Sequence, residues 1–211
     1  MSTINLPNKL TLIRLGLVPL LLLFLSVDNI YSHSLALITF IGASLTDYYD
    51  GKIARERAIE TDFGRLMDPL ADKILTSAAF IYFVGSYPYI PAWIVTVIIA
   101  REFAVSGIRM LALMKGKVVA ADRAGKLKTI SQLTVIIAIL NVIISKKIIV
   151  SVSSYWTSIE FWAKLGIHIL VAITLVMTVY SGYNYLRANR HLFWESLRSN
   201  NSNRLDQIIE P

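Results

Sequence analysis

The chain contains six long hydrophobic segments, which are separated by short polar or charged stretches. Each segment is close to the ~20 residues that an α-helix needs to cross the hydrocarbon core of a bilayer. Two of them are separated by residues 85–91, a turn with glycine and proline inside a stretch that has no charged residue. The pattern therefore predicts an all-α integral membrane protein whose six transmembrane helices occupy residues 10–27, 34–57, 64–86, 91–114, 125–145 and 164–187.

The composition agrees with a membrane location. Hydrophobic residues make up 55% of the 211 residues and charged residues only 17%, with a mean hydropathy of +0.57. These values lie outside the usual range of a soluble domain of this length. Cysteine is absent, which excludes a disulfide framework, a thiolate metal site and a cysteine nucleophile. We expect one membrane domain over residues 1–190 and a polar cytoplasmic tail over residues 191–211.

The basic residues lie mainly on one side of the predicted spans. If the chain starts in the cytoplasm, 18 of the 21 lysines and arginines fall on the cytoplasmic side, and only Lys146, Lys147 and Lys164 fall on the other. This asymmetry predicts a multi-pass protein of the cytoplasmic (inner) membrane with both termini in the cytoplasm. The net charge of +7 favours contact with anionic membrane lipids. Because this charge is spread along the membrane borders, we expect no nucleic-acid partner.

Four aspartates lie within 26 residues beside long apolar runs: Asp47, Asp50, Asp68 and Asp72. Ionisable side chains at membrane depth cost several kcal/mol unless they are paired, hydrated or bound to cations. On helices, spacings of three and four residues place each pair of aspartates on one face. Facing pairs would supply the hard oxygen ligands that Mg²⁺ or Mn²⁺ prefers. The aspartates therefore predict a cation site.

Small residues accompany these carboxylates. Gly51 and Ala54 fall on the helical stripe of the first pair, and Gly64 lies one turn before Asp68. The missing side chains would let the phosphates of a ligand approach the metal ions. Arg55 would then meet a phosphate charge.

The complete run, Asp47-x2-Asp50-Gly51-x2-Ala54-Arg55-x8-Gly64-x3-Asp68-x3-Asp72, resembles the signature of the CDP-alcohol phosphatidyltransferases, membrane enzymes that make phospholipids. The resemblance implies two Mg²⁺ or Mn²⁺ ions on the four aspartates, bridging the diphosphate of CDP-diacylglycerol. It also implies that Gly51, Ala54 and Arg55 contact the CDP part, and that Asp72 acts as general base on the acceptor hydroxyl. A catalytic cavity that opens toward the cytoplasm and a homodimer are further expectations from the family.

A second group of charges lies on the fourth and fifth predicted spans: Arg101, Glu102, Arg109, Lys126 and Lys128. Cations at this depth need an anionic partner. We expect Arg101, Arg109 and Lys126 to bind the phosphate of the acceptor, and Glu102 to form an ion pair with Arg101 or a neighbouring helix. The surrounding sequence resembles the phosphatidylglycerophosphate synthase branch of the family, whose acceptor is sn-glycerol 3-phosphate.

Other functions remain open at this point. Within the family, the acceptor could be inositol phosphate, serine or another alcohol. A membrane prenyltransferase also uses aspartates and Mg²⁺, but those enzymes resemble larger bundles with differently spaced aspartate motifs. A divalent-cation transporter could place carboxylates at membrane depth, yet it would have no use for Gly51, Ala54 and Arg55 in that order.

Overall fold

The computed structural model describes residues 6–57, 62–87, 90–114, 123–152, 156–188 and 190. Within these ranges the chain is helical apart from short turns, and the prediction of six helices is confirmed. The helices are α1 Leu6–Ser26, α2 Ile30–Arg57, α3 Asp62–Ser86, α4 Ala92–Met114, α5 Arg123–Val152 and α6 Trp156–Ala188.

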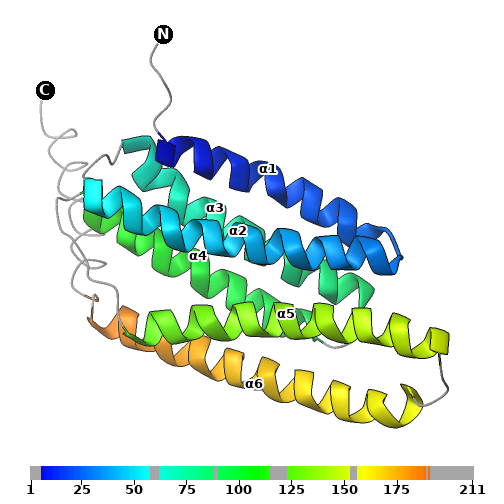
Figure 1. The fold of residues 1–211 in the computed structure, drawn as a ribbon. Coiled ribbons are helices and arrows are strands. Elements are labelled where there is room, and N and C mark those ends of the chain that lie inside the picture. The colour runs from blue at the N-terminus through cyan, green and yellow to red at the C-terminus, as the bar shows by residue number, and fades with distance from the viewer. Residues whose placement is uncertain are drawn as a thin grey trace, which may run out of the picture.

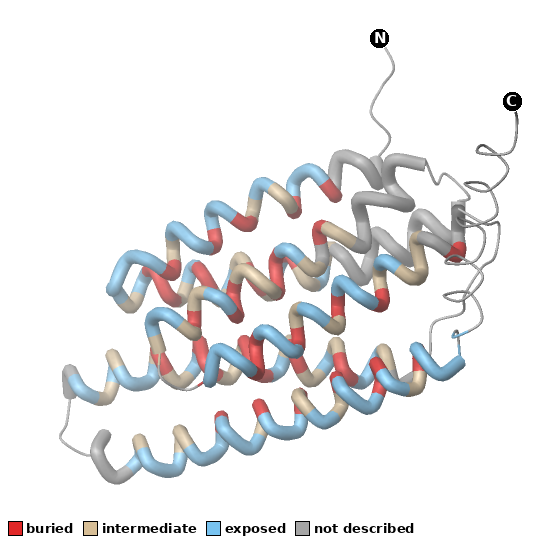
Figure 2. Tube along the Cα trace, turned by 180° about the vertical axis from the view of Figure 1, so that it is seen from behind, coloured by how far each residue is buried: buried red, intermediate tan, exposed pale blue. Residues whose placement is uncertain are grey.

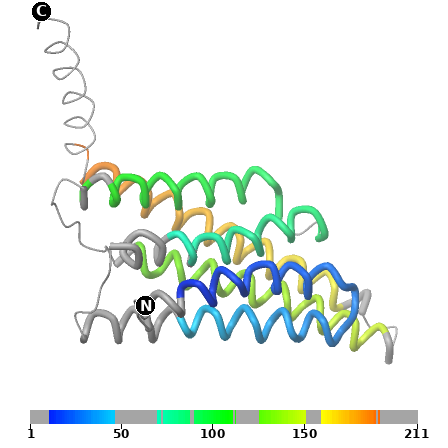
Figure 3. Tube along the Cα trace, turned by 90° about the horizontal axis from the view of Figure 1, so that it is seen from above, coloured from blue at the N-terminus to red at the C-terminus, as the bar shows by residue number. Residues whose placement is uncertain are grey.

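The helices alternate in direction, so α1 begins and α6 ends at the same end of an elongated bundle (Figure 1). We call this the proximal end, and the end with the α1–α2 and α3–α4 turns the distal end. Going round the bundle, α1 packs on α2, α2 on α5, α5 on α6, α6 on α4, α4 on α3, and α3 on α1. Additional contacts join α3 and α5 across this ring. Figure 3 shows the same bundle from a second direction. Residues far apart in sequence, such as those of α4 and α6, therefore meet side by side.

The interior is apolar, and so is much of the outer surface. Large side chains from five helices are fully buried, among them Leu21, Phe40, Phe80, Ile139 and Val171. Large apolar side chains are also exposed along the outward sides of the helices, including Ile38, Ile81, Trp93 and Val176 (Figure 2). An apolar exterior of this extent is unfavourable in water and suits contact with lipid.

Two helices are long and apolar enough to cross a membrane, at Gly125–Val150 in α5 and Ile159–Ala188 in α6. Only 28% and 33% of these stretches are buried, whereas the core helix of a soluble protein is mostly buried. The apolar stretches in α1, α2 and α3 are shorter, at Thr11–Ser26, Ile30–Thr46 and Lys73–Ser86.

Several helix ends differ from the predicted spans. The predicted turn at residues 85–91 is confirmed, because α3 ends at Ser86 and α4 begins at Ala92. The predicted ends at residues 145 and 164 are wrong, because α5 continues to Val152 and α6 already begins at Trp156. Likewise α1 begins before residue 10 and α2 before residue 34. Hydropathy marks the apolar part of a helix, whereas backbone hydrogen bonding continues through polar residues beyond it.

Side chains from α2, α3 and the adjoining turns close the distal end. Asn29 caps α2, since its Oδ1 accepts a hydrogen bond from the backbone N–H of Tyr31 at 3.0 Å. The last carbonyls of α1 accept hydrogen bonds from the hydroxyls of Ser32 on α2 and Tyr82 on α3. His33 is fully buried, and its two ring nitrogens lie within hydrogen-bonding distance of the Asn29 carbonyl and the Tyr87 hydroxyl.

An ion pair joins α5 to the α1–α2 turn. Lys147 Nζ lies 2.5 Å from Asp28 Oδ1, and this hydrogen bond holds the pKa of the exposed Asp28 carboxyl below its ordinary value. Lys147, which lies beyond the predicted end of the fifth span at residue 145, is therefore part of a helix that continues to Val152.

Candidate functional site

The backbone brings the two aspartate pairs to similar depths. Asp47 and Asp50 lie near the end of α2, and Asp68 and Asp72 near the start of α3, so all four lie toward the proximal end. With a rise of ~1.5 Å per residue, Asp47 and Asp72 are each about 15 Å from that end of their helix, and Asp50 and Asp68 about 10 Å. Since α2 and α3 run in opposite directions and contact each other, the fold is compatible with one site shared by both pairs.

The metal ligation itself stays a prediction. The side chains of the four aspartates lie outside the part of the chain that the structure describes. The same holds for the side chains of the other motif residues, Gly51, Ala54, Arg55 and Gly64.

Arg101 lies near the middle of α4 and directs its guanidinium group toward α6. Its side chain is only 12% exposed, and Nη2 donates a hydrogen bond to Ser181 Oγ at 2.7 Å. Its Nη1 lies 3.4 Å from Glu102 Oε1. The aliphatic stem passes so close to α6 that a Cβ atom on Gly182 would lie 3.0 Å from Arg101 Cγ. The glycine thus makes room for the arginine.

Glu102 connects α4 to α5. Its carboxylate pairs with Lys128 Nζ and accepts a hydrogen bond from Gln132 Nε2 at 3.1 Å. The side chains of Glu102 and Lys128 are 8% and 7% exposed, so this is a buried ion pair with an additional polar partner. The expected ion pair of Glu102 with Arg101 and a neighbouring helix is confirmed. A buried pair of this kind offsets its desolvation cost only when its remaining polar atoms are also satisfied.

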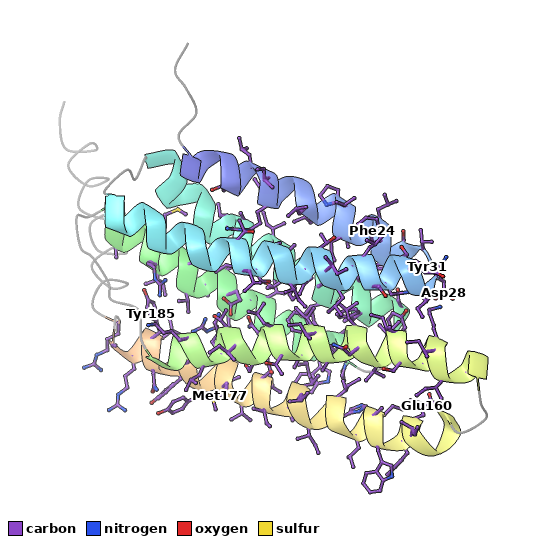
Figure 4. The ribbon with its side chains drawn as sticks, in the orientation of Figure 1. Phe24, Asp28, Tyr31, Glu160, Met177 and Tyr185 are labelled. Carbon is purple, nitrogen blue, oxygen red and sulfur yellow. The ribbon has the colours of Figure 1, made fainter. Side chains whose placement is uncertain are left out.

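Arg109 lies closer to the proximal end of α4. Its Cζ is 5.8 Å from the centre of the Tyr185 ring on α6, within the range of a cation–π contact. Tyr185 lies near the proximal end of α6, opposite to Asp28 and Glu160 (Figure 4). We call Arg101 and Arg109 the α4 arginines.

Lys126, the third cation of the predicted phosphate site, differs from the α4 arginines in its exposure. Lys126 is exposed on the first turn of α5, whereas Lys128 is buried against Glu102. The structure therefore directs both α4 arginines toward α6, and the contribution of Lys126 stays a prediction. Counting Arg101, Arg109, Lys128 and Glu102, the buried group has a net charge of about +2, which suits the dianion of a phosphate monoester.

One unpaired atom on each of the α4 arginines also points to an anionic ligand. The Nε atoms of Arg101 and Arg109 are buried and have no hydrogen-bond partner within the described ranges. A buried donor without a partner costs free energy, so an anion that accepts these hydrogen bonds would be stabilised there. This supports the prediction of an anion site on α4.

Some residues of this region were missing from the sequence-based site. On α6, Thr174, Thr178, Ser181 and Tyr185 are all buried, at spacings of four, three and four residues. This helical periodicity of polar residues in an apolar segment was a readable signal of a polar face. On α1, Arg14 is only 3% exposed and lies about 12 Å from the proximal end of its helix, a depth comparable to that of the aspartates. A charged residue inside an apolar run was a signal in the sequence that could have identified Arg14 as a site residue.

Comparisons with known proteins agree with these features. The model of the CDP-alcohol phosphatidyltransferase family matches residues 4–180. A protein of Bacillus subtilis (strain 168) named CDP-diacylglycerol--glycerol-3-phosphate 3-phosphatidyltransferase is 37% identical over 209 residues, covering 93% of this chain and 99% of the relative. Proteins with the same name from Rickettsia typhi and Pectobacterium atrosepticum are 34% and 31% identical, over 90% and 89% of this chain and 99% and 96% of their own lengths.

The match covers α1 to α5 and the part of α6 up to residue 180, and it includes both the aspartate motif and the α4 arginines. The chain belongs to the CDP-alcohol phosphatidyltransferase family.

Proposed function

We propose that this protein transfers the phosphatidyl group of CDP-diacylglycerol to sn-glycerol 3-phosphate, which yields phosphatidylglycerophosphate and CMP in phospholipid biosynthesis. The similar proteins from three bacteria have the corresponding name, and the alignments span nearly their entire lengths. The observation that supports a phosphorylated acceptor is the pair of partly buried α4 arginines, together with the net positive charge around them.

The residues for a divalent metal fit this function. Members of the CDP-alcohol phosphatidyltransferase family generally depend on a divalent metal. Carboxylate groups are suitable ligands for Mg²⁺ or Mn²⁺. In our proposal Asp47, Asp50, Asp68 and Asp72 hold two such ions, and similar depths on α2 and α3 support this assignment. When bound, the ions neutralise charge on the diphosphate and on the departing CMP.

The residues of the motif bind the donor and activate the acceptor. Gly51, Ala54 and Gly64 leave space for the CDP group, and Arg55 pairs with a phosphate. Asp72 removes the proton of the acceptor hydroxyl. The hydroxyl oxygen then bonds to the phosphorus attached to diacylglycerol, and the bond from this phosphorus to the CMP oxygen breaks. No covalent enzyme intermediate is needed.

The acceptor phosphate binds beside this site, at Arg101, Arg109 and Lys126. Arginine can donate two parallel hydrogen bonds to a phosphate, and its charge strengthens both of them. Holding the phosphate there would keep the acceptor hydroxyl near the aspartates.

The proposed setting is the cytoplasmic membrane, which residues 1–190 cross with six helices, followed by a polar tail over residues 191–211. The proximal end, both termini and a catalytic cavity face the cytoplasm, and two copies form a homodimer. The distribution of charge supports this orientation, because Lys146, Lys147 and Lys164 lie in the distal parts of α5 and α6.

Steady-state kinetics with each substrate varied in turn tests the acceptor site. Arg109→Ala and Arg101→Ala each remove one charge-assisted phosphate contact, worth about 1.5 to 3 kcal/mol, so kcat/KM for sn-glycerol 3-phosphate should fall roughly tenfold to hundredfold. The KM for CDP-diacylglycerol should hardly change. Lys147→Ala, which removes a cation at the distal end, is the matched control.

Two results would reject this acceptor site. One is unaltered acceptor kinetics in both arginine variants. The other is a wild-type protein that uses glycerol, serine or inositol phosphate as readily as sn-glycerol 3-phosphate.

A further inference from the structure

We infer that Ser181 and Gly182 of α6 are positioning residues that set the orientation of Arg101 and thereby the selectivity for a phosphorylated acceptor. This inference rests on the proposed function, in which Arg101 binds the acceptor phosphate. It adds a role for α6, which contains no charged residue between Lys164 and Arg187.

The first part of the argument is the path of the Arg101 side chain. Its stem crosses α6 at Gly182, where an added Cβ would lie 3.0 Å from Cγ and 3.5 Å from Nε. Real Cβ contacts are seldom this close, so any larger residue at position 182 would push the arginine away from α6. Gly166 on the same helix shows the contrast, because a Cβ there would have no neighbour within 4 Å. The lack of a side chain at position 182 therefore allows Arg101 to pass this close to α6.

The second part is the hydrogen bond at the end of the side chain. Ser181 Oγ accepts from Arg101 Nη2 at 2.7 Å, while Nη1 faces Glu102 Oε1 at 3.4 Å. These contacts fix the plane of the guanidinium group between α6 and the carboxylate of Glu102. A guanidinium group has five N–H donors in a rigid plane, so fixing this plane also fixes the direction of the remaining donors.

The third part of the argument concerns the N–H donors of the arginines that have no hydrogen-bond partner in the described part of the structure. Arg101 Nε is buried without a hydrogen-bond partner among the described residues, and so is Nε of Arg109. Each of these buried N–H groups can donate a charge-assisted hydrogen bond to a phosphate oxygen. Preorganised donors improve binding because less conformational freedom is lost when the ligand arrives. Ser181 and Gly182 supply this preorganisation to Arg101.

Kinetics of Ser181→Ala tests the hydrogen bond. The variant should raise the KM for sn-glycerol 3-phosphate about threefold to tenfold, while kcat and the KM for CDP-diacylglycerol stay near wild type. Ser34→Ala is the matched control, since the Ser34 hydroxyl near the distal end donates its hydrogen bond to the Ile30 carbonyl of its own helix. The control should leave the acceptor KM unchanged.

Gly182→Ala tests the close approach, with Gly166→Ala as its control. The added methyl group should raise the acceptor KM at position 182 and leave it unchanged at position 166. A double variant tests whether the effect passes through Arg101. In an Arg101→Lys background, Ser181→Ala should cause little further loss, because a lysine cannot use the same planar geometry.

The outcomes separate this inference from the proposed function. If Arg101→Ala raises the acceptor KM but Ser181→Ala and Gly182→Ala do not, the positioning role is wrong and the acceptor site stands. If Arg101→Ala itself has no effect, the acceptor site is wrong. An equal rise in KM for both substrates, or an undiminished effect of Ser181→Ala in the Arg101→Lys background, would also overturn the positioning role.

Discussion

Individual charged residues in this bundle differ in how many of their polar atoms have a hydrogen-bond or ion-pair partner. Glu102 has polar partners on two helices, whereas the α4 arginines keep buried donors without a partner within the described ranges. A satisfied buried carboxylate stabilises the packing of its helices, whereas an unsatisfied buried cation indicates a place for a ligand. This difference distinguishes Glu102, whose charge has a structural role, from Arg101 and Arg109 on the same helix, whose charges have a proposed role in ligand binding.

The aspartates of the motif should also differ in role. Asp72→Asn should mainly lower kcat, by about a hundredfold or more, because the amide cannot accept the proton of the acceptor hydroxyl. Asp47→Asn and Asp68→Asn should instead raise the Mg²⁺ concentration needed for half-maximal activity, since each removes a charged ligand. Initial rates measured over a range of Mg²⁺ concentrations and pH distinguish the two effects. Near wild-type turnover of Asp72→Asn at every pH would refute the general base.

The sequence was sufficient to predict the buried charge at position 101 and the pairing of Glu102, because ionisable residues in an apolar segment need partners. It could not identify Ser181 and Gly182 as the neighbours of Arg101. That contact depends on α4 packing against α6, 80 residues away, and local periodicity does not encode which helices meet. The exposed position of Lys126 and the buried one of Lys128 likewise depend on the orientation of α5 in the bundle.

At the scale of the helices, polar contacts fix how neighbouring elements pack. The Glu102 carboxylate links α4 to α5, and the Tyr82 hydroxyl links α3 to the end of α1. The number of helices was predictable from hydropathy because each has an apolar segment. Their ends were not, because the helical backbone of α5 and α6 continues through Lys147 and Glu160, past the residues at which the predicted spans stop.

Removal of the Glu102 carboxylate should strongly destabilise the α4–α5 packing. Glu102→Ala leaves Lys128 buried without its partner carboxylate, which costs about 3 to 5 kcal/mol in comparable buried pairs. The double variant Glu102→Ala, Lys128→Met should recover part of this loss. The measurement is the unfolding midpoint of purified protein in detergent.

A matched control for this prediction is the more exposed pair of Glu160 and Lys164, whose charged atoms lie 2.9 Å apart. Glu160→Ala should cost at most about 0.5 kcal/mol, since solvent screens a pair of this kind. Equal destabilisation by Glu102→Ala and Glu160→Ala would contradict the structural role of the buried pair.

At the scale of the whole molecule, the bundle has two distinct ends. The distal end is closed by hydrogen bonds and by the ion pair between Asp28 and Lys147. The aspartates, Arg109 and Tyr185 lie toward the proximal end. Family membership and the apolar exterior favour a membrane location, in which the proposed chemistry would occur on one side only.

The absence of cysteine makes this orientation directly testable. A single cysteine introduced as Ser154→Cys, between α5 and α6, should react with a membrane-impermeant maleimide added to intact cells or spheroplasts. Lys117→Cys, between α4 and α5, should react only after the membrane is permeabilised. The opposite labelling pattern would show that the proximal end faces away from the cytoplasm.

The most direct test of the central claim is the formation of phosphatidylglycerophosphate by the purified protein. With CDP-diacylglycerol and labelled sn-glycerol 3-phosphate, we expect labelled lipid and CMP to form in equal amounts when Mg²⁺ or Mn²⁺ is present. Excess EDTA should abolish the reaction, and added metal ion should restore it. Full turnover in excess EDTA, or no lipid product from these two substrates with either metal ion, would contradict the proposed metal-dependent phosphatidyl transfer.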